Sequence, residues 1–542
     1  MKKLFLLLFM AAQLLLPAQR PVKNMIIMIP DGTSTALLSL SRWYQRFGNP
    51  EKQSLAVDSI LRGLVKTYSS DAPIGDSAPT TSCYMTGQPS QTGFISTYPV
   101  ATSHDLLPID PQKAYQPLAT LFEAAKYYHG MATGIVAKCE FPHATPADCA
   151  SHTYSRNHYP EIAKQMIHNN LDVMIAGGYD YLNAKNENYL YEQGYSVAKS
   201  YTALQQVTSG RLWALPEPKF IPYRIDAKDS VLSLGKLTQK ALDLLSQNDS
   251  GFILMVEGSL VDWAAHENDA KTAILEFLEF DDAVQVALNF ARKDGQTALV
   301  VLPDHGNSGI SMGNRNSKNY DRLSLSAFFE SMENYHKSAW VFAEELQKES
   351  LENAELLFRK YYQIRLTDDE RKTFYSAYDY KQSPIPKEKR STLTLVRSIT
   401  KILYDRTYIG FTTYGHTGED VFFAGYHPAN DMPTGIIDNK EVNSYLCRQL
   451  QLEEKLPELT QTLFTPHTKL FDASFTVRID SLGEQNYRLS ATKKRLKVIA
   501  ESGNNQLYIN GKTVLLSSVI VYMDKNKVFY LPKKLENLIL EK

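Results

Sequence analysis

Short, almost wholly apolar runs alternate with longer segments of helical periodicity between about residues 25 and 310. The runs are apolar on both faces, which is typical of parallel strands covered by helices on each side. One helical segment, 274–291, stops at Asp294-Gly295, a pair that favours helix termination. The pattern predicts an α/β fold with a doubly wound, mostly parallel sheet and helices on both faces. The expected core strands are 25–29, 131–136, 173–176, 252–256 and 298–302.

Two later segments depart from this alternation. Residues 315–405 are charged, rich in tyrosine and helical in pattern, with a proline-bearing link at Ser383-Pro-Ile-Pro-Lys, and we interpret them as a helical insertion. The sheet is expected to resume at 408–414. From residue 472, alternating strands and the hairpin signal Asn510-Gly511 predict a small β-rich C-terminal module. The predicted organisation is a main α/β domain at 20–471, with the insertion inside it, and a module at 472–542.

Charge and the N-terminus restrict the functional class. The 58 basic and 59 acidic residues nearly cancel, so net charge gives no basis for binding nucleic acid or an anionic membrane surface. Residues 1–19 begin with Lys2-Lys3, continue with a mostly apolar stretch, and are typical of a cleavable signal peptide. A retained anchor is the alternative, although the run is short for a membrane span. We therefore predict an exported, periplasmic protein without a stable membrane span.

The four cysteines, Cys83, Cys139, Cys149 and Cys447, include no CxxC pair. This argues against a thiolate zinc site, so any metal is expected to be held by oxygen and imidazole ligands. Cys139 and Cys149 are close enough in sequence to form a disulfide in an oxidising compartment. The spacing leaves that pairing open.

Metal-type ligands follow several of the expected strands. Asp31-Gly32 follows the first strand, and Asp304-His305 follows the last. Asp262 and His266 lie four residues apart, so on a helix their side chains share a face. Ligands of open α/β sheets collect beyond the carboxyl ends of the strands, which predicts a metal site there. Each residue alone has an ordinary explanation, such as a helix N-cap for Asp31. The same pattern recurs at Glu257 and at His416.

Asp76-Ser-Ala-Pro-Thr80 precedes a run of small residues that ends at Gly87. Pro79 fits the first turn of a helix, where its missing N–H costs little. Ser77 is therefore expected at a helix N-terminus, where free N–H groups and the helix dipole favour developing negative charge. There Ser77 either acts as a nucleophile or merely caps the helix.

These dispersed motifs together resemble the metal-dependent alkaline phosphatase family. Their order and spacing match from about residue 24 to 425, with 315–405 poorly covered. The resemblance implies an enzyme that hydrolyses small phosphate monoesters, and releases inorganic phosphate, through a phosphorylated Ser77. It also implies two zinc ions and one magnesium ion as cofactors, and a possible homodimer. The residues that carry it are Asp31-Gly, Asp76-Ser-Ala with Gly87, Glu257-Gly with Asp262 and His266, Asp304-His305, and His416-Thr-Gly-Glu-Asp.

The resemblance assigns a role to each matching residue. The ligands implied for the first zinc are Asp262, His266 and His416, and those for the second are Asp31, Asp304 and His305. The third ion, usually magnesium, would be held by Glu257 and Thr145, with Asp31 bridging to it. Arg156 is similar to the guanidinium that clasps two phosphate oxygens, a contact suited to its planar fork.

Several positions depart from the family pattern. Pro79 and Thr81 stand where smaller residues are usual, so Thr80 and Thr81 are alternative nucleophiles. Trp263 replaces a common Lys or His, and would either stack on an aromatic leaving group or pack beside the metals. His143 occupies a position that varies between Asp and His, and near the third ion it would favour zinc over magnesium.

Three other functional classes are alternatives to a phosphomonoesterase: a diesterase, a sulfatase and an inactive binder. A diesterase on the same fold is opposed by Arg156, which requires two free nonbridging oxygens beyond those held by zinc. A sulfatase is opposed by the absence of a Cys or Ser followed two residues later by Pro-x-Arg. A catalytically inactive phosphate or metal binder would retain the ligands without turnover. The natural phosphate ester is not indicated by the sequence.

Overall fold

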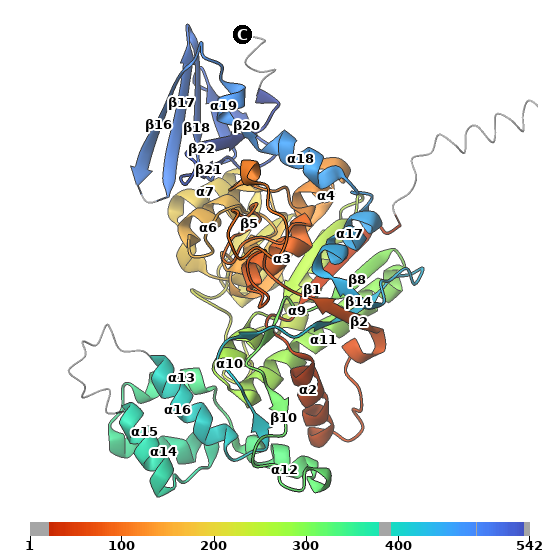
Figure 1. The fold of residues 1–542 in the computed structure, drawn as a ribbon, viewed down its shortest axis with the longest axis vertical. Coiled ribbons are helices and arrows are strands. Elements are labelled where there is room, and N and C mark those ends of the chain that lie inside the picture. Colours follow the sequence, from red (N-terminus) through yellow and green to blue (C-terminus); the bar gives the residue numbers. More distant parts are fainter. Residues whose placement is uncertain (1–20, 379–391, 484, 536–542) are drawn as a thin grey trace, which may run out of the picture.

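The computed structural model describes residues 21–378, 392–483 and 485–535. The proposed signal peptide at 1–19 and the proline-bearing link at 383–387 lie outside the described residues. The α/β centre has the helical segment at one end of the long axis and the β-rich module at the other (Figure 1). Among the described helices, none is long and apolar enough to cross a membrane.

A ten-stranded sheet forms the centre, in the order β14-β2-β13-β8-β1-β7-β3-β4-β6-β5. All its pairs are parallel except those of β13, which runs antiparallel to both neighbours. The five expected core strands are present as β1, β3, β4, β7 and β8, so the predicted fold class is confirmed. The bounds are β1 Asn24–Ile29, β2 Leu61–Lys66, β3 Ala132–Glu140, β4 Val173–Gly177, β5 Tyr195–Ala198, β6 Arg211–Ala214, β7 Phe252–Glu257, β8 Thr297–Val301, β13 Val421–Tyr426 and β14 Gly435–Asp438.

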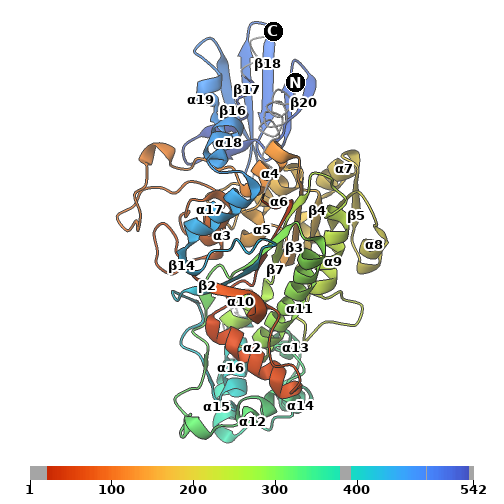
Figure 2. The same cartoon turned by 90° about the vertical axis from the view of Figure 1, so that its right-hand side faces the viewer.

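Helices cover both faces of the sheet, which explains why its strands are apolar throughout. Along β1, Ile26 and Met28 belong to one hydrophobic core, and Met25, Ile27 and Ile29 to the other. The first core is closed by α2 Thr35–Gly48, α9 Leu234–Leu245 and α11 Ala270–Asp294. The second is closed by α3 Ser77–Thr86, α4 Leu121–His129, α6 Tyr159–His168 and α17 Asn439–Leu450. Figure 2 shows the strands between α3 and α17 on one side and α9 and α11 on the other.

The segment predicted as an insertion folds into helices that pack on an aromatic cluster. The ring of Phe342 lies 5.0 Å from those of Phe358 and Tyr362, and Phe374 lies 5.0 Å from Phe358. The helices are α12 Leu325–Phe329, α13 Ala339–Leu346, α14 Leu351–Tyr362, α15 Asp368–Tyr378 and α16 Thr392–Tyr404.

The expectation that the sheet resumes at 408–414 is wrong. That stretch contributes only β11 Ile409–Gly410, which pairs with β10 Ser311–Met312 outside the main sheet. The chain must first cross the carboxyl edge of the sheet, where it places His416, before it enters β13 at Val421. The apolar residues at 408–411 therefore pack on the first core rather than extend the sheet.

The C-terminal region forms a five-stranded antiparallel sheet with its own hydrophobic core. Asn510 and Gly511 both have positive φ, 50° and 80°, and join β19 to β20 as the hairpin signal predicts. A smaller sheet beside it begins at β15 Thr465–Pro466, upstream of residue 472. The other strands are β16 Thr476–Gly483, β17 Asn486–Lys493, β18 Leu496–Glu501, β19 Gln506–Ile509, β20 Lys512–Leu515, β21 Val521–Met523 and β22 Val528–Leu531.

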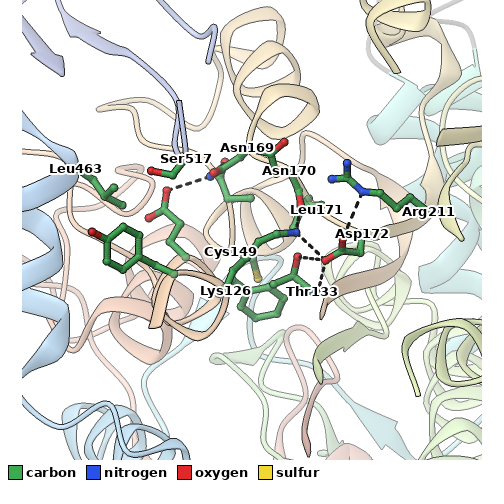
Figure 3. Close-up of a pocket in the computed structure, with 14 residues that line it drawn as sticks. Lys126, Thr133, Cys149, Asn169, Asn170, Leu171, Asp172, Arg211, Leu463 and Ser517 are labelled. Carbon is green, nitrogen blue, oxygen red and sulfur yellow. Dashed lines mark hydrogen bonds and ion pairs between the residues drawn. The ribbon is translucent and has the colours of Figure 1, made fainter. Parts of the chain in front are cut away.

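Buried polar contacts fasten this C-terminal region to the α/β centre. Ser518 donates to Glu123 on α4 at 3.1 Å, and Lys164 on α6 donates to the carbonyl of Ser502 at 2.6 Å. The pocket beside Glu123 is lined by charges that pair with one another (Figure 3). In it, Asp172 lies 2.7 Å from Lys126 and 3.3 Å from Arg211. The charged side chains of this pocket are therefore explained by ion pairs within the protein.

Candidate metal and phosphate site

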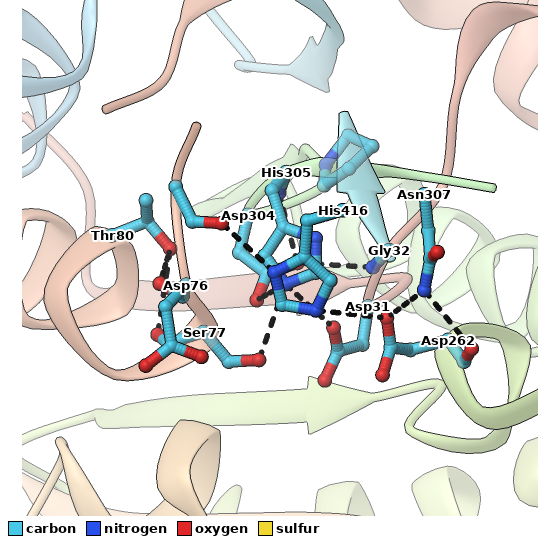
Figure 4. Close-up of polar contacts among 12 residues, drawn as sticks. Asp31, Gly32, Asp76, Ser77, Thr80, Asp262, Asp304, His305, Asn307 and His416 are labelled. Atoms are coloured by element: carbon cyan, nitrogen blue, oxygen red, sulfur yellow. Dashed lines mark hydrogen bonds and ion pairs between the residues drawn. The ribbon is translucent and has the colours of Figure 1, made fainter. Parts of the chain in front are cut away.

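The carboxyl ends of adjacent strands bring the predicted ligands together. β1 lies between β7 and β8, and Ile29 pairs with Glu257. Asp31 follows β1, Glu257 ends β7, and Asp304 follows β8, so the three carboxylates meet at one edge of the sheet. All three are fully buried. Figure 4 shows Asp31 and Asp304 at this edge, together with Asp262, His305 and His416.

Asp262, His266 and His416 form one group of potential ligands, with their ligand atoms within 4.8 Å of one another. Asp262 and His266 share a face of α10 Leu260–His266, with 3.4 Å between Oδ2 and Nε2. His416 reaches them from β12 His416–Thr417, which pairs with β9 Gly306–Asn307. Gly32 lets the backbone after β1 pass close to Asp262, because a Cβ at its position would lie 2.3 Å from Asp262 Oδ1.

Asp31, Asp304 and His305 form a second group, also within 4.8 Å. His305 Nε2 lies 3.4 Å from an oxygen of each aspartate. The backbone N–H groups of Gly32 and His305 both donate to Asp304 Oδ1, at 3.1 Å each, which fixes that carboxylate. The other oxygen of Asp304 and both oxygens of Asp31 have no hydrogen-bond partner among the described residues.

The histidine tautomers identify which nitrogen faces the site. His266 Nδ1 lies 2.7 Å from the carbonyl of Tyr414, and His416 Nδ1 lies 2.9 Å from that of Gly75. A carbonyl only accepts, so each Nδ1 carries the proton and each Nε2 presents a lone pair. His305 has the same arrangement toward the carbonyl of Gly306. Such contacts orient imidazoles that bind metals.

The electrostatics of the two groups fit cations. Burial, together with the charges of Asp304 and Asp262, holds the pKa of Asp31 well above its usual value. Burial also raises the pKa of Glu257, to about 8. Burial works in the same direction at Asp262, but the facing imidazoles of His266 and His416 outweigh it and lower the pKa of that carboxyl. Unpaired buried carboxylates are costly, and divalent cations remove that cost.

A third group lies on the other side of Glu257. Its carboxylate Oε1 and the hydroxyl of Thr145, on α5 Ala144–Ala147, are buried and lack partners in the described chain. Glu257, His143 and Cys139 offer ligand atoms within 4.8 Å of one another. Burial and the charge of Arg156 lower the pKa of His143 to about 3, so its ring is neutral. The residues thus fit a third cation, with Cys139 as a neighbour that the sequence-based ligand set omitted.

Ser77 is the first residue of α3, as predicted, and Asp76 is its N-cap. The Ser77 hydroxyl lies 3.2 Å from His305 Nε2, which accepts its proton because Nδ1 is protonated. The alternative nucleophile Thr80 instead donates to the carbonyl of Asp76 at 2.8 Å. Thr81 is buried without a partner among the residues described. Ser77 is therefore the hydroxyl of this helix that contacts the metal-ligand cluster.

Arg156 lies in a turn before α6, and its side chain reaches Asp76, the residue before Ser77. One guanidinium nitrogen donates to Asp76, and the other lies 3.4 Å from His143 Nε2. Arg156, Asp76, His266 and His416 line a single open pocket. Solvent thus reaches a surface that has a guanidinium on one side and metal-type imidazoles on the other.

One further contact was not foreseen from the sequence. Asn307 donates to Asp262 Oδ1 at 2.6 Å and so orients that carboxylate. Its position two residues after His305, in the same strand-end motif, was the available signal. All four cysteines are free and buried, so Cys139 and Cys149 do not form a disulfide in this structure.

A doubly wound sheet with a serine at a helix N-terminus, an arginine and three groups of metal-type ligands defines a metal-dependent phosphoryl-transfer enzyme. The sequence model described as "Alkaline phosphatase" matches residues 22–452. The chain therefore belongs to the alkaline phosphatase family, a family of metal-dependent phosphoric monoester hydrolases.

Individual relatives agree with this assignment. Alkaline phosphatase 3 of Bacillus subtilis (strain 168) is 30% identical over 451 residues, covering 81% of this chain and 91% of the relative. The crystal structure of the cold-active enzyme from Shewanella sp. has a TM-score of 0.67 at 29% identity, covering 79% of this chain and 99% of that one. The Thermus thermophilus alkaline phosphatase has a TM-score of 0.69 at 23% identity, covering 82% and 96%, and supports the fold.

Proposed function

We propose that this protein is an exported alkaline phosphatase that hydrolyses phosphate monoesters through a phosphorylated Ser77. The observation that carries the proposal is the position of the Ser77 hydroxyl, at a helix N-terminus and 3.2 Å from His305 Nε2. A developing oxyanion is favoured there by the helix dipole and the free N–H groups.

Two zinc ions would be held by the first two ligand groups, Asp262 with His266 and His416, and Asp31 with Asp304 and His305. Glu257 and Thr145, with Asp31 between the sites, would hold a third divalent cation, which the family resemblance implies is magnesium. Bound cations supply charge neutralisation and lower the pKa of the attacking oxygens. Zinc suits the carboxylate and imidazole donors present.

In the proposed reaction, Ser77 Oγ attacks phosphorus as the ester P–O bond breaks and the alcohol leaves. Water then attacks the phosphoserine, which restores the Ser77 hydroxyl and releases inorganic phosphate. Arg156 would bind two nonbridging oxygens through parallel N–H donors. A monoester has a third nonbridging oxygen for the cations, whereas a diester has only two in all. Phosphoryl transfer depends mainly on such positioning and charge neutralisation.

Hydrolysis of an aryl phosphomonoester and of its diester by wild type, Ser77→Ala and Thr81→Val tests the proposal. We expect Ser77→Ala to lose at least about 10³-fold in kcat, as other covalent nucleophiles do, and Thr81→Val to retain activity. Mass spectrometry of acid-quenched enzyme should find phosphate on the peptide that contains Ser77. Preference for the diester would instead support a diesterase, and turnover by Ser77→Ala would move the nucleophile to Thr81 or water. Phosphate binding without turnover in metal-replete protein would support a catalytically inactive binder.

The N-terminal 19 residues, with their basic start and apolar run, support export to the periplasm as part of the same proposal. A homodimer is also proposed, on the family resemblance. Analysis of the mature N-terminus and light scattering would test these two points separately from catalysis.

A further inference from the structure

Cys139 lies against the third ligand group, on a strand that no catalytic residue uses. We propose that Cys139 is a sulfur ligand of the third cation, so that this position takes a zinc-like cation in preference to Mg²⁺. The inference deepens the proposed function, because it rests on a third cation being bound beside Glu257. It also reverses the expectation from CxxC spacing that sulfur takes no part in metal binding.

The strand register aims the thiol at the site. In the pairing of β3 with β7, Ala137 lies opposite Glu257, and Cys139 is two residues further toward the carboxyl edge. Residues two apart on a strand share a face. Cys139 Sγ accordingly lies 3.4 Å from Glu257 Oε2 and is fully buried.

Two buried oxygen ligands that lack a partner among the described residues belong to Glu257, at the end of β7, and to Thr145, on the short helix α5 that packs against β7. Glu257 Oε1 and Thr145 Oγ1, both fully buried, have no hydrogen-bond partner within the described part of the chain. Glu257, Cys139 and His143 offer ligand atoms within 4.8 Å of one another, so the three side chains are grouped closely enough to surround one ion.

The donor set favours zinc over magnesium. Mg²⁺ prefers octahedral oxygen coordination and keeps several waters, whereas thiolate and imidazole select Zn²⁺. Oxygen donors from Glu257 and Thr145 suit either ion. The imidazole of His143 and the sulfur of Cys139 therefore both favour zinc, and the sulfur is the softer of the two ligands. On binding, the thiol S–H bond breaks, an S–metal bond forms, and one proton is released.

Cobalt spectroscopy separates sulfur ligation from a simple S–H···O contact. Metal-free protein reconstituted with three equivalents of Co²⁺ should show the near-ultraviolet charge-transfer band of a cobalt–thiolate bond. Cys139→Ser should abolish that band, whereas Cys447→Ser, which changes another buried thiol, on α17, should keep it. After dialysis against equal Zn²⁺ and Mg²⁺, wild type should retain three zinc ions, and Cys139→Ser should retain less zinc at the third position, where the imidazole of His143 remains.

Three results would overturn the inference. They are a wild-type cobalt spectrum without the thiolate band, a band that persists in Cys139→Ser, and fewer than four free thiols in unreduced protein because of a Cys139–Cys149 disulfide. The phosphatase assay remains a separate readout. A thiolate band in a protein that fails to hydrolyse monoesters would refute the proposed function and leave the sulfur ligand standing.

Discussion

The Nε2 atoms of His266 and His416 lie 3.0 Å apart, with both rings held from behind by backbone carbonyls. Each Nδ1 keeps its proton for its carbonyl, so two lone pairs face each other unless a cation or a proton lies between them. Burial and the neighbouring His305 lower the pKa of His416 to about 4, so protonation does not relieve this contact at neutral pH. A bound cation does.

In the metal-free enzyme, the free energy of unfolding should fall as pH rises from about 6.5 to 8. Burial raises the pKa of Glu257 from 4.5 to about 8. The folded protein therefore keeps a proton on Glu257 that the unfolded chain has released, and this stabilisation is lost as pH rises toward 8. Asp31, whose pKa is also raised, acts in the same direction. His416, with a lowered pKa, acts in the opposite direction, but only below its ordinary value of 6.5.

Thermal unfolding of chelated and zinc-loaded protein at pH 6.5 and pH 8 measures this effect. The chelated protein should have a lower Tm at pH 8 than at pH 6.5, and the loaded protein should have a higher Tm than the chelated one at both values. A Tm of the chelated protein that stays constant or rises over this range would contradict the assignment of unpaired carboxylates.

Arg156→Lys should lower kcat/KM for monoesters by about 10- to 150-fold. Lysine keeps the charge but cannot make two parallel hydrogen bonds, and one charge-assisted bond contributes about 1.5–3 kcal/mol. Asp76, which accepts from Arg156, is expected to act through the arginine. In a double-mutant cycle, Asp76→Ala should therefore add little to Arg156→Ala. Fully additive losses would show that Asp76 acts independently of the guanidinium.

The sheet could be predicted from the sequence because its strands are buried on both faces. Residues 25–29 are all fully buried, so an unbroken apolar run along the chain indicates a strand in the interior of the sheet. The ligands could be predicted because parallel strands deliver their carboxyl ends to one edge. Asp31, Glu257 and Asp304 could therefore be predicted to lie together without knowing how the residues between them fold.

What could not be predicted depends on contacts between distant segments. Residues 408–411 are as apolar as a core strand, but they pack on the first hydrophobic core, and their strand pairing is limited to the two residues of β11. Cys139 has no sequence signal as a ligand, because its relation to Glu257 arises from the register of β3 on β7. Lys138 is nearly fully buried between Glu276 and Glu279, at 2.6 Å from each, a pairing that no local pattern indicates.

Trp263→Ala should reduce turnover of aryl and alkyl phosphates by the same factor. The indole lies 5.1 Å from the ring of Phe220 and 5.7 Å from that of His143, both edge-on, which favours the packing role over leaving-group stacking. Loss of the indole should loosen His143 and, through it, Arg156. Trp263→Phe should restore most of the activity toward both esters. A loss confined to the aryl ester would instead support stacking on the leaving group.

Arg397→Ala, in the helical insertion, should weaken zinc binding at His266 by a few-fold, up to about tenfold. The guanidinium of Arg397, on α16, lies 4.0 Å over the ring of Tyr414, whose carbonyl accepts from His266 Nδ1. A cation–π contact of this kind contributes about 0.5–2 kcal/mol, and part of that energy holds the carbonyl in place. The insertion would thus support a metal ligand that it does not touch.

The matched control is Lys401→Ala, which removes a charge from the same helix but one paired with Asp405 at 2.6 Å. Competition with a chromogenic chelator should show weaker retention of one zinc ion by Arg397→Ala and wild-type retention by Lys401→Ala. Arg397→Lys should recover part of the affinity, because an ammonium also binds an aromatic face. Equal zinc retention by Arg397→Ala and wild type would show that Tyr414 is held without the insertion.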